Sequence, residues 1–342
     1  MVAFEMQNKE AITAIENVLD TIGCKDEEER SYIYQLMTTA GKLEEDGAGL
    51  LELKILTSSM KELRYAYKIF DQYRDRRKVS VFGSSRVDPD DPNYRMAEEF
   101  SSKAVQDGYM IISGAGPGIM EAANKGAGRD QSFGLNIHVP HEQQANKYID
   151  EDKKCINFRY FFSRKLIFCK ESDAAVFFPG GFGTHDELFE LLCLMQTGRH
   201  HLVPIILCDQ DGFWDEFLQY VENKLVRRGM INKEDLQLLD LVDSSEEILD
   251  IINHFYQNFH SERFVGDDFV IRFRDFPGNE ALRSLADEFG ELCPESGFKV
   301  VRGPIEGEES GAPSDLYRLI FRMTNHDYGE LHRLINFIND WI

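Results

Sequence analysis

Three glycine-bearing turns each follow a short, strand-like run of residues. They are Gly83-Ser84-Ser85, Gly114-Ala115-Gly116-Pro117-Gly118 and Pro179-Gly180-Gly181-Phe182-Gly183-Thr184. Glycine lets backbone N–H groups approach a ligand with no side chain between them, and a helix N-terminus behind the turn adds partial positive charge. One such turn is usually only a tight connection. Three at successive strand ends predict a shared phosphate-binding site.

The third turn gives the sharpest signal, because a carboxylate follows it closely. It continues as Thr184-His185-Asp186-Glu187 into the helical run Leu188–Gln196. One interpretation is structural: Thr184 caps the helix and Glu187 bonds back to the Thr184 N–H, as in a capping box. That interpretation leaves the preceding glycines unexplained. The functional alternative places a phosphate over the helix start and uses Glu187 for acid/base chemistry.

A basic pair, Arg164 and Lys165, stands before the strand that leads to this turn. Basic pairs are usually solvated helix surface, but this position favours a role at the site. Other phosphate motifs fit poorly. The second turn lacks the GxGxxG spacing of dinucleotide-binding proteins, and the chain has no GxxxxGK[ST] loop of ATP-cleaving enzymes.

An α/β domain over residues 75–260 is expected to position these residues. Strand-like runs that alternate with helical stretches predict a doubly wound, Rossmann-like parallel sheet, with ligands at the carboxyl ends of its strands. The runs are Val79–Phe82, Met110–Ser113, Phe133–Val139, Ala174–Phe178 and Val203–Cys208.

Two further regions flank this domain. Residues 1–74 form an N-terminal helical region, with a third helix from about Leu50 towards Arg74. Residues 263–342 predict a small C-terminal α+β domain, because strand-like and helical runs both occur there. Its expected strands are Phe264–Phe273 and Leu316–Met323, and its expected helices are Asn279–Cys293 and Tyr328–Trp341.

Composition excludes several classes of function. The 342 residues carry a formal net charge of −22, which disfavours nucleic-acid polymers and anionic lipid as partners. No apolar run reaches the length of about 18 residues that suggests a membrane span. Six cysteines without a CxxC pair and the absence of a secretory signal pattern predict a cytoplasmic protein. No His/Cys/Asp cluster predicts a metal, and no cofactor is expected.

The motifs together resemble the LOG ("Lonely Guy") family over roughly residues 78–250. Arg164-Lys165, Asp173-Ala174 and Pro179–Glu187 are similar to its RK…DA…PGGxGTxxE signature, and Gly116–Asn124 and Gly134–Ile137 also resemble it. Ser113 and Ala115 depart from it, since many relatives have glycine there. Members are nucleoside 5′-monophosphate phosphoribohydrolases, often labelled lysine decarboxylases. A decarboxylase dependent on pyridoxal phosphate needs a Schiff-base lysine, and no lysine here has such a context.

The resemblance implies the roles of individual residues. Arg164 and Glu187 are the expected catalytic pair, and the expected substrate is a nucleoside 5′-monophosphate, namely AMP or a related purine nucleotide. The expected substrate-binding residues are Ser84, Gly114, Gly116, Glu121, Lys165, Gly180, Gly181, Gly183 and Thr184. A homodimer or larger homo-oligomer is expected. The alternatives are a non-catalytic nucleotide or cofactor carrier, and an assembly protein whose terminal regions do the main work.

Overall fold

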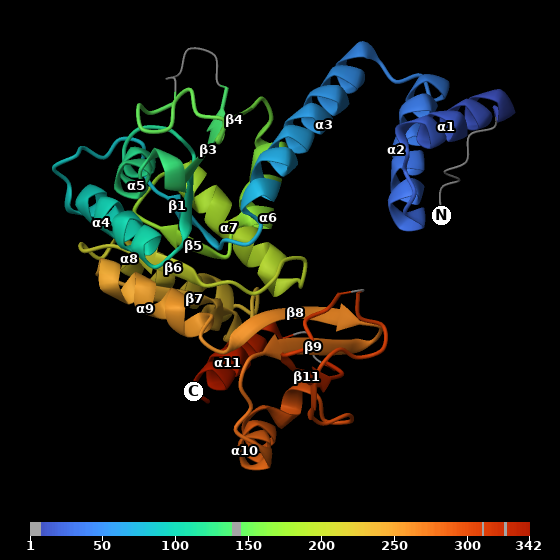
Figure 1. Ribbon diagram of the computed structural model, residues 1–342. Helices are drawn as coiled ribbons and strands as arrows, with labels where there is room; N and C mark the ends of the chain where they lie inside the picture. Colours follow the sequence, from blue (N-terminus) through green and yellow to red (C-terminus); the bar gives the residue numbers. More distant parts are fainter. Residues whose placement is uncertain (1–7, 139–144, 310, 325–326) are drawn as a thin grey trace. The chain divides into compact units, whose positions relative to one another are not determined.

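The computed structural model describes residues 8–138, 145–309, 311–324 and 327–342 (Figure 1). The chain divides into two compact units, residues 1–64 and 65–342. Val139, the last residue of one expected strand, lies outside the described residues. No helix in the described ranges combines the length and apolarity needed to cross a membrane.

The first unit is helical, as the sequence predicted. It contains α1 (Lys9–Ile22), α2 (Glu27–Glu45) and most of α3 (Leu50–Phe70), which ends four residues before the expected Arg74. Side chains cap the first two helices: Asn8 accepts from two N–H groups at the start of α1, and Asp26 does the same for α2. Arg30 on α2 pairs with Glu16 and Asp20 on α1, at 2.6 and 2.8 Å, which ties these two helices together.

A seven-stranded parallel sheet forms the centre of the second unit, in the order β4-β3-β2-β1-β5-β6-β7. The strands are β1 (Lys78–Phe82), β2 (Met110–Ser113), β3 (Ser132–Ile137), β4 (Cys155–Phe158), β5 (Ala174–Phe177), β6 (Ile205–Cys208) and β7 (Leu239–Val242). The doubly wound α/β prediction is therefore confirmed. The two edge strands, β4 and β7, were not predicted; both are only four residues long and neither is fully buried.

The chain winds in opposite directions from β1, so β1 and β5 form the topological switch point where ligands bind in such sheets. The helices that follow β1 and β2 are α4 (Pro92–Gln106) and α5 (Ile119–Ala127), and they pack against each other. Helix α4 also contacts α9 (Ser245–Phe255). The later crossovers contain α6 (Phe161–Glu171), α7 (Phe182–Gln196) and α8 (Phe213–Tyr220). Right-handed connections place these three helices on the opposite face from α4 and α5.

Gly126 allows α4 and α5 to approach closely, since a Cβ atom built there would lie 2.0 Å from the Glu98 carbonyl oxygen. We expect Gly126→Ala to lower the free energy of unfolding by about 1–3 kcal/mol, because the helices must separate to accept the methyl group. Urea denaturation measures this. Gly290→Ala is the matched control, because no atom lies within 4 Å of a Cβ there. Equal stability of the two variants would contradict the packing argument.

The C-terminal part contains a four-stranded antiparallel sheet in the order β10-β11-β9-β8. Its elements are β8 (Phe259–Val265), β9 (Asp268–Phe273), α10 (Asn279–Phe289), β10 (Lys299–Arg302), β11 (Tyr317–Phe321) and α11 (Tyr328–Asn339). The prediction of one strand over Phe264–Phe273 is wrong: Gly266, with a φ of 60°, turns the chain there and creates the β8–β9 hairpin. Strand β10 was also missed.

Candidate active site

The three glycine-bearing turns lie against one another at the carboxyl ends of β1, β2 and β5. The Ser84 N–H of the first turn donates to the Pro179 carbonyl of the third, at 3.0 Å. The Ser84 carbonyl accepts from the Ile119 N–H that follows the second turn, at 3.1 Å. Gly118 has a φ of 67°, and a Cβ there would lie 2.3 Å from the Ser84 oxygen. The predicted convergence of the turns is therefore present in the structure.

The second turn carries a residue in a backbone conformation that favours glycine. Ala115 has a φ of 62°, and the Ser113 hydroxyl accepts from its N–H at 3.1 Å. The same hydroxyl bonds to Asn124 at 2.7 Å, so a buried network supports the turn. This network supports Ala115 in a backbone conformation that glycine adopts more readily.

The remaining predicted residues of this turn are differently exposed. Gly114 is buried and Gly116 is half-buried, and the Met120 side chain lies against both. Glu121 stands in the first turn of α5, a quarter exposed, with Lys147 as a distant partner at 3.9 Å. The Glu121 carboxylate therefore lies near the second turn, and its ion pair with Lys147 is long.

Helix α7 begins three residues before the start that a capping box at Thr184 would require. Gly181 is the residue before its first turn, and the Thr184 N–H donates to the Gly181 carbonyl at 3.1 Å. The capping-box interpretation is therefore wrong, because the Thr184 N–H is already inside the helix. Among the described residues no side chain caps α7, and a Cβ built on Gly181 or Gly183 would meet none of their atoms within 4 Å. The helix start is open to an anion.

Gly180 and Thr184 close the turn from within. A Cβ on Gly180 would lie 2.1 Å from the Thr184 hydroxyl oxygen and 3.0 Å from the Ser84 nitrogen. Thr184 itself is buried. These two residues hold the third turn against the first, whereas Gly181 and Gly183 present its open surface.

Glu187 is a buried carboxylate beside two cations. Its residue is 8% exposed, and burial raises its pKa to about 7, while Lys165 and Arg164 oppose that rise. The Lys165 ammonium lies 3.6 Å from Glu187 and closer to two other carboxylates, Asp186 at 2.9 Å and Glu190 at 2.7 Å. Lys165 is therefore held by α7, and it fixes the position of Glu187. The sequence prediction did not identify Asp186 or Glu190, whose placement follows from the helical spacing of α7.

Arg164 reaches the same place from α6. Its Nε donates to the Leu135 carbonyl at 2.7 Å, and its guanidinium lies beside Gly114, where a Cβ would come within 2.5 Å. Burial lowers the pKa of Arg164, and the negative charge of Glu187 raises it. The structure thus brings the predicted pair into electrostatic contact. The Leu135 carbonyl is a positioning group that the sequence did not reveal, since any residue supplies one.

The pKa of Glu187 matters for what the site can do. A carboxyl that titrates near neutral pH can give or take a proton under physiological conditions, and as an anion it can stabilise a neighbouring positive charge. Open N–H donors lie at the start of the same helix. The arrangement combines an anion-binding turn with an acid/base group.

Known proteins match this part of the chain. Residues 120–252 match the family model described as "Possible lysine decarboxylase". The rice "Probable cytokinin riboside 5'-monophosphate phosphoribohydrolase LOGL3" is 29% identical over 92 residues, 27% of this chain and 43% of that protein. The Arabidopsis thaliana "Cytokinin riboside 5'-monophosphate phosphoribohydrolase LOG7" is 28% identical over 119 residues, 34% of this chain and 54% of that protein. These matches span less than two thirds of either relative.

Solved structures also align with the chain. The molybdenum cofactor binding protein from Rippkaea orientalis is 18% identical, with a TM-score of 0.37, over 52% of this chain and 96% of that one. The molybdenum cofactor carrier protein from Chlamydomonas reinhardtii is 15% identical, with a TM-score of 0.35, over 52% of this chain and 96% of that one. The likeness to LOG phosphoribohydrolases rests instead on the sequence matches. This chain is therefore similar, over part of its length, to the LOG phosphoribohydrolases.

Proposed function

We propose that this chain hydrolyses the N-glycosidic bond of a nucleoside 5′-monophosphate and releases the free base and ribose 5-phosphate. The observation that carries the proposal is the environment of Glu187: a buried carboxyl with a pKa of about 7, beside Arg164 and Lys165, on the helix that the third turn begins. AMP or a related purine nucleotide is the proposed substrate. The names of the rice and Arabidopsis relatives support the same reaction type.

The chemistry requires a negative charge near the sugar. Breaking the bond from C1′ to the base nitrogen develops positive charge on the ribose, as in glycoside hydrolysis. The Glu187 carboxylate stabilises that charge or takes a proton from the attacking water. Water adds its oxygen to C1′, and the departing base carries away the bonding electrons and gains a proton. Arg164 holds the phosphate, a ribose hydroxyl or the departing base.

The phosphate supplies the binding energy that positions the ribose. In this proposal Gly181 and Gly183 bind the 5′-phosphate at the open start of α7, and Gly180 and Thr184 hold the turn that presents them. Ser84, Gly114, Gly116 and Glu121 line the neighbouring turns. Binding energy from a remote, non-reacting group raises turnover by fixing the reacting atoms in place. Lys165 acts through Glu187, which it holds at 3.6 Å.

A panel of nucleoside 5′-monophosphates tests the reaction. The purified protein is incubated with each nucleotide, and free base and ribose 5-phosphate are measured by chromatography. Release of both products by the wild-type protein, and not by Glu187→Gln, is the expected result. Binding of the nucleotides without release of any base would overturn the proposal and favour the carrier alternative.

We further propose that the chain forms at least a homodimer through the exposed apolar face of α6. Phe161 and Phe162 are each 55% exposed and Leu166 is 47% exposed, next to Arg164 in the sequence. Leu166→Glu is expected to halve the molar mass, because a charge placed in an apolar interface is costly. Size-exclusion chromatography with light scattering measures the mass, and Met230→Glu, at a position elsewhere that is 59% exposed, is the control. An unchanged mass for Leu166→Glu would contradict the proposal that this face of α6 forms the dimer interface.

The cytoplasm is the proposed compartment. All six cysteines are free thiols in the structure, which suits a reducing environment.

A further inference from the structure

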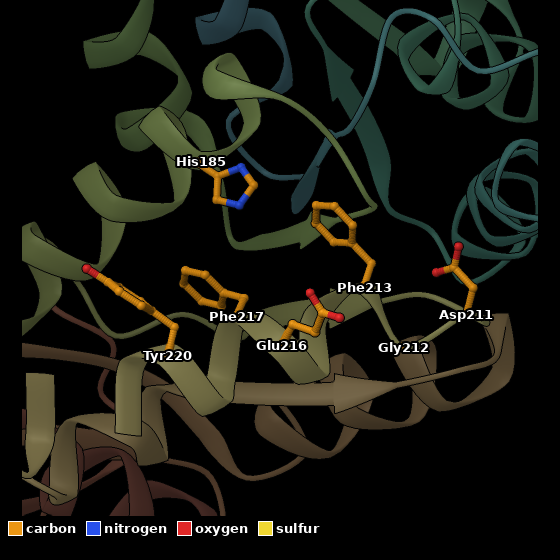
Figure 2. Close-up of a pocket in the computed structure, with 7 residues that line it drawn as sticks. All are labelled: His185, Asp211, Gly212, Phe213, Glu216, Phe217 and Tyr220. Atoms are coloured by element: carbon orange, nitrogen blue, oxygen red, sulfur yellow. The ribbon is translucent and has the colours of Figure 1, made fainter. Parts of the chain in front are cut away.

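A cavity of about 440 Å³ lies between α7 and α8, and nothing proposed above uses it (Figure 2). Four rings line it, from His185, Phe213, Phe217 and Tyr220. Two carboxylates, those of Asp211 and Glu216, complete the lining together with Gly212. We call this cavity the aromatic groove.

The aromatic groove is separate from the candidate active site. His185 and Glu187 are two residues apart on α7, and successive residues of a helix point about 100° apart, so the two side chains leave opposite flanks of the helix. Neither Arg164 nor Glu187 lines the groove. A ligand in the groove would therefore occupy a second site.

The start of α8 is held firmly, so the groove exists before any ligand arrives. The Asp209 carboxylate accepts from the Gly212 and Trp214 N–H groups at 2.7 and 2.8 Å. The Trp214 indole N–H donates to the Phe177 carbonyl at 3.0 Å, which attaches the helix to β5. The Trp214 ring packs against Phe213 and Phe217, with centroids 5.0 and 5.5 Å away. The rings of the groove are thus fixed by a buried tryptophan.

The charges of the groove are negative and unpaired. Within the described ranges, neither Asp211 nor Glu216 forms an ion pair, although many exposed carboxylates of this chain do. Figure 2 shows the Glu216 carboxylate close to the Phe213 and Phe217 side chains in this view. The His185 ring packs edge-on against the Phe213 and Phe217 rings, with centroids 6.0 and 5.7 Å away. His185 Nδ1 bonds to the Gly181 carbonyl, so Nδ1 carries the proton and neutral His185 offers a lone pair on Nε2.

We propose that the aromatic groove binds an organic ammonium ion. Aromatic faces attract cations, most strongly cations with weak hydration such as alkylated ammonium groups. The two carboxylates add direct attraction, and a net charge of −22 raises the local concentration of cations. A neutral planar ligand would gain stacking from the rings but nothing from the carboxylates. The combination of rings and free carboxylates favours the cation.

Choline and its neutral isostere 3,3-dimethylbutan-1-ol test the proposal, because they differ in charge and hardly in shape. Binding to the whole protein is measured by calorimetry and by the fluorescence of Trp214, which touches the groove rings. We expect choline to bind at least about tenfold more tightly than the alcohol, which corresponds to about 1.4 kcal/mol. Saturating AMP, added to the Glu187→Gln protein, should leave choline binding unchanged.

Variants of the groove locate the bound choline. Glu216→Gln and Phe217→Leu are each expected to weaken choline binding by about tenfold, through the loss of a charge and of a ring. Glu222→Gln, an exposed carboxylate beyond the groove, is the matched control and should bind choline like the wild type. Thermal unfolding verifies that each variant is folded.

Three results would overturn the proposal. Equal affinity for choline and the alcohol would make the groove an apolar site without charge preference. Choline binding that both groove variants leave unchanged would place it elsewhere. Failure of choline and of tetramethylammonium to bind the wild-type protein would exclude the cation. None of these depends on hydrolysis, so they are distinguishable from a failure of the proposed activity.

Discussion

Replacing Glu187 by glutamine is expected to reduce the turnover of nucleoside 5′-monophosphate hydrolysis by about 10²–10⁴-fold, the usual contribution of one acid/base group. Glutamine has nearly the same shape, so the contacts of α7 with the third turn are retained. It carries no charge to stabilise the ribosyl cation and cannot take a proton from water. Steady-state release of free base, measured at saturating nucleotide, gives the comparison.

The stability of the same variant provides a control for its fold. Glu187 has a pKa of about 7, raised by burial from its ordinary value of 4.5, so the folded protein binds this proton more tightly than the unfolded chain does. Ionising Glu187 therefore costs stability as the pH rises from about 4.5 to 7, and the full cost is present above 7. Glu187→Gln removes that cost. We expect it to be more stable than the wild type at pH 8, by about 1–3 kcal/mol, and similar at pH 4.

Two results would contradict this account of Glu187. Full turnover in the glutamine variant would remove the residue from the chemistry. Lower stability of the variant at pH 8 would mean that the carboxylate is a structural partner of Lys165 rather than a destabilising catalytic group.

The fold was largely predictable from the sequence because its central strands are strongly patterned. The strands β1, β2, β5 and β6 are short apolar runs between glycine or polar turns, and all four were found. The edge strands β4 and β7 were missed, because a strand with one neighbour needs little apolar patterning. In the C-terminal part, Gly266 and Asp267 interrupt the apolar pattern and form the turn of the β8–β9 hairpin, so the wrong prediction of one strand came from overlooking this turn signal.

The candidate site was predictable for the residues that a motif names, and not for those that geometry selects. Arg164 and Glu187 were identified, and the structure brings them together electrostatically. The capping box at Thr184 failed because local sequence gives the preference for a cap but not the residue at which the helix begins. The aromatic groove was missed altogether, because its walls come from α7 and α8, and their approach depends on the packing of the sheet.

Arg164→Gln is expected to reduce turnover by about 10²–10³-fold, the usual cost of removing one group that stabilises developing charge. The guanidinium is held against the Leu135 carbonyl and Gly114, so a shorter, neutral side chain cannot replace it. Lys170→Gln, an exposed position on the same helix, is the matched control and should keep near wild-type turnover.

The pH dependence of the Arg164→Gln variant separates its effect on the substrate from its effect on Glu187. If Glu187 acts as a carboxylate, wild-type activity falls as the pH drops below about 7. The positive charge of Arg164 lowers the pKa of Glu187, so its removal must raise that pKa further and move the acid limb of the profile to higher pH. Reduced turnover with an unmoved acid limb would mean that Arg164 acts on the substrate alone. A raised KM with unchanged kcat would assign it to substrate binding, because only interactions made in the transition state change kcat.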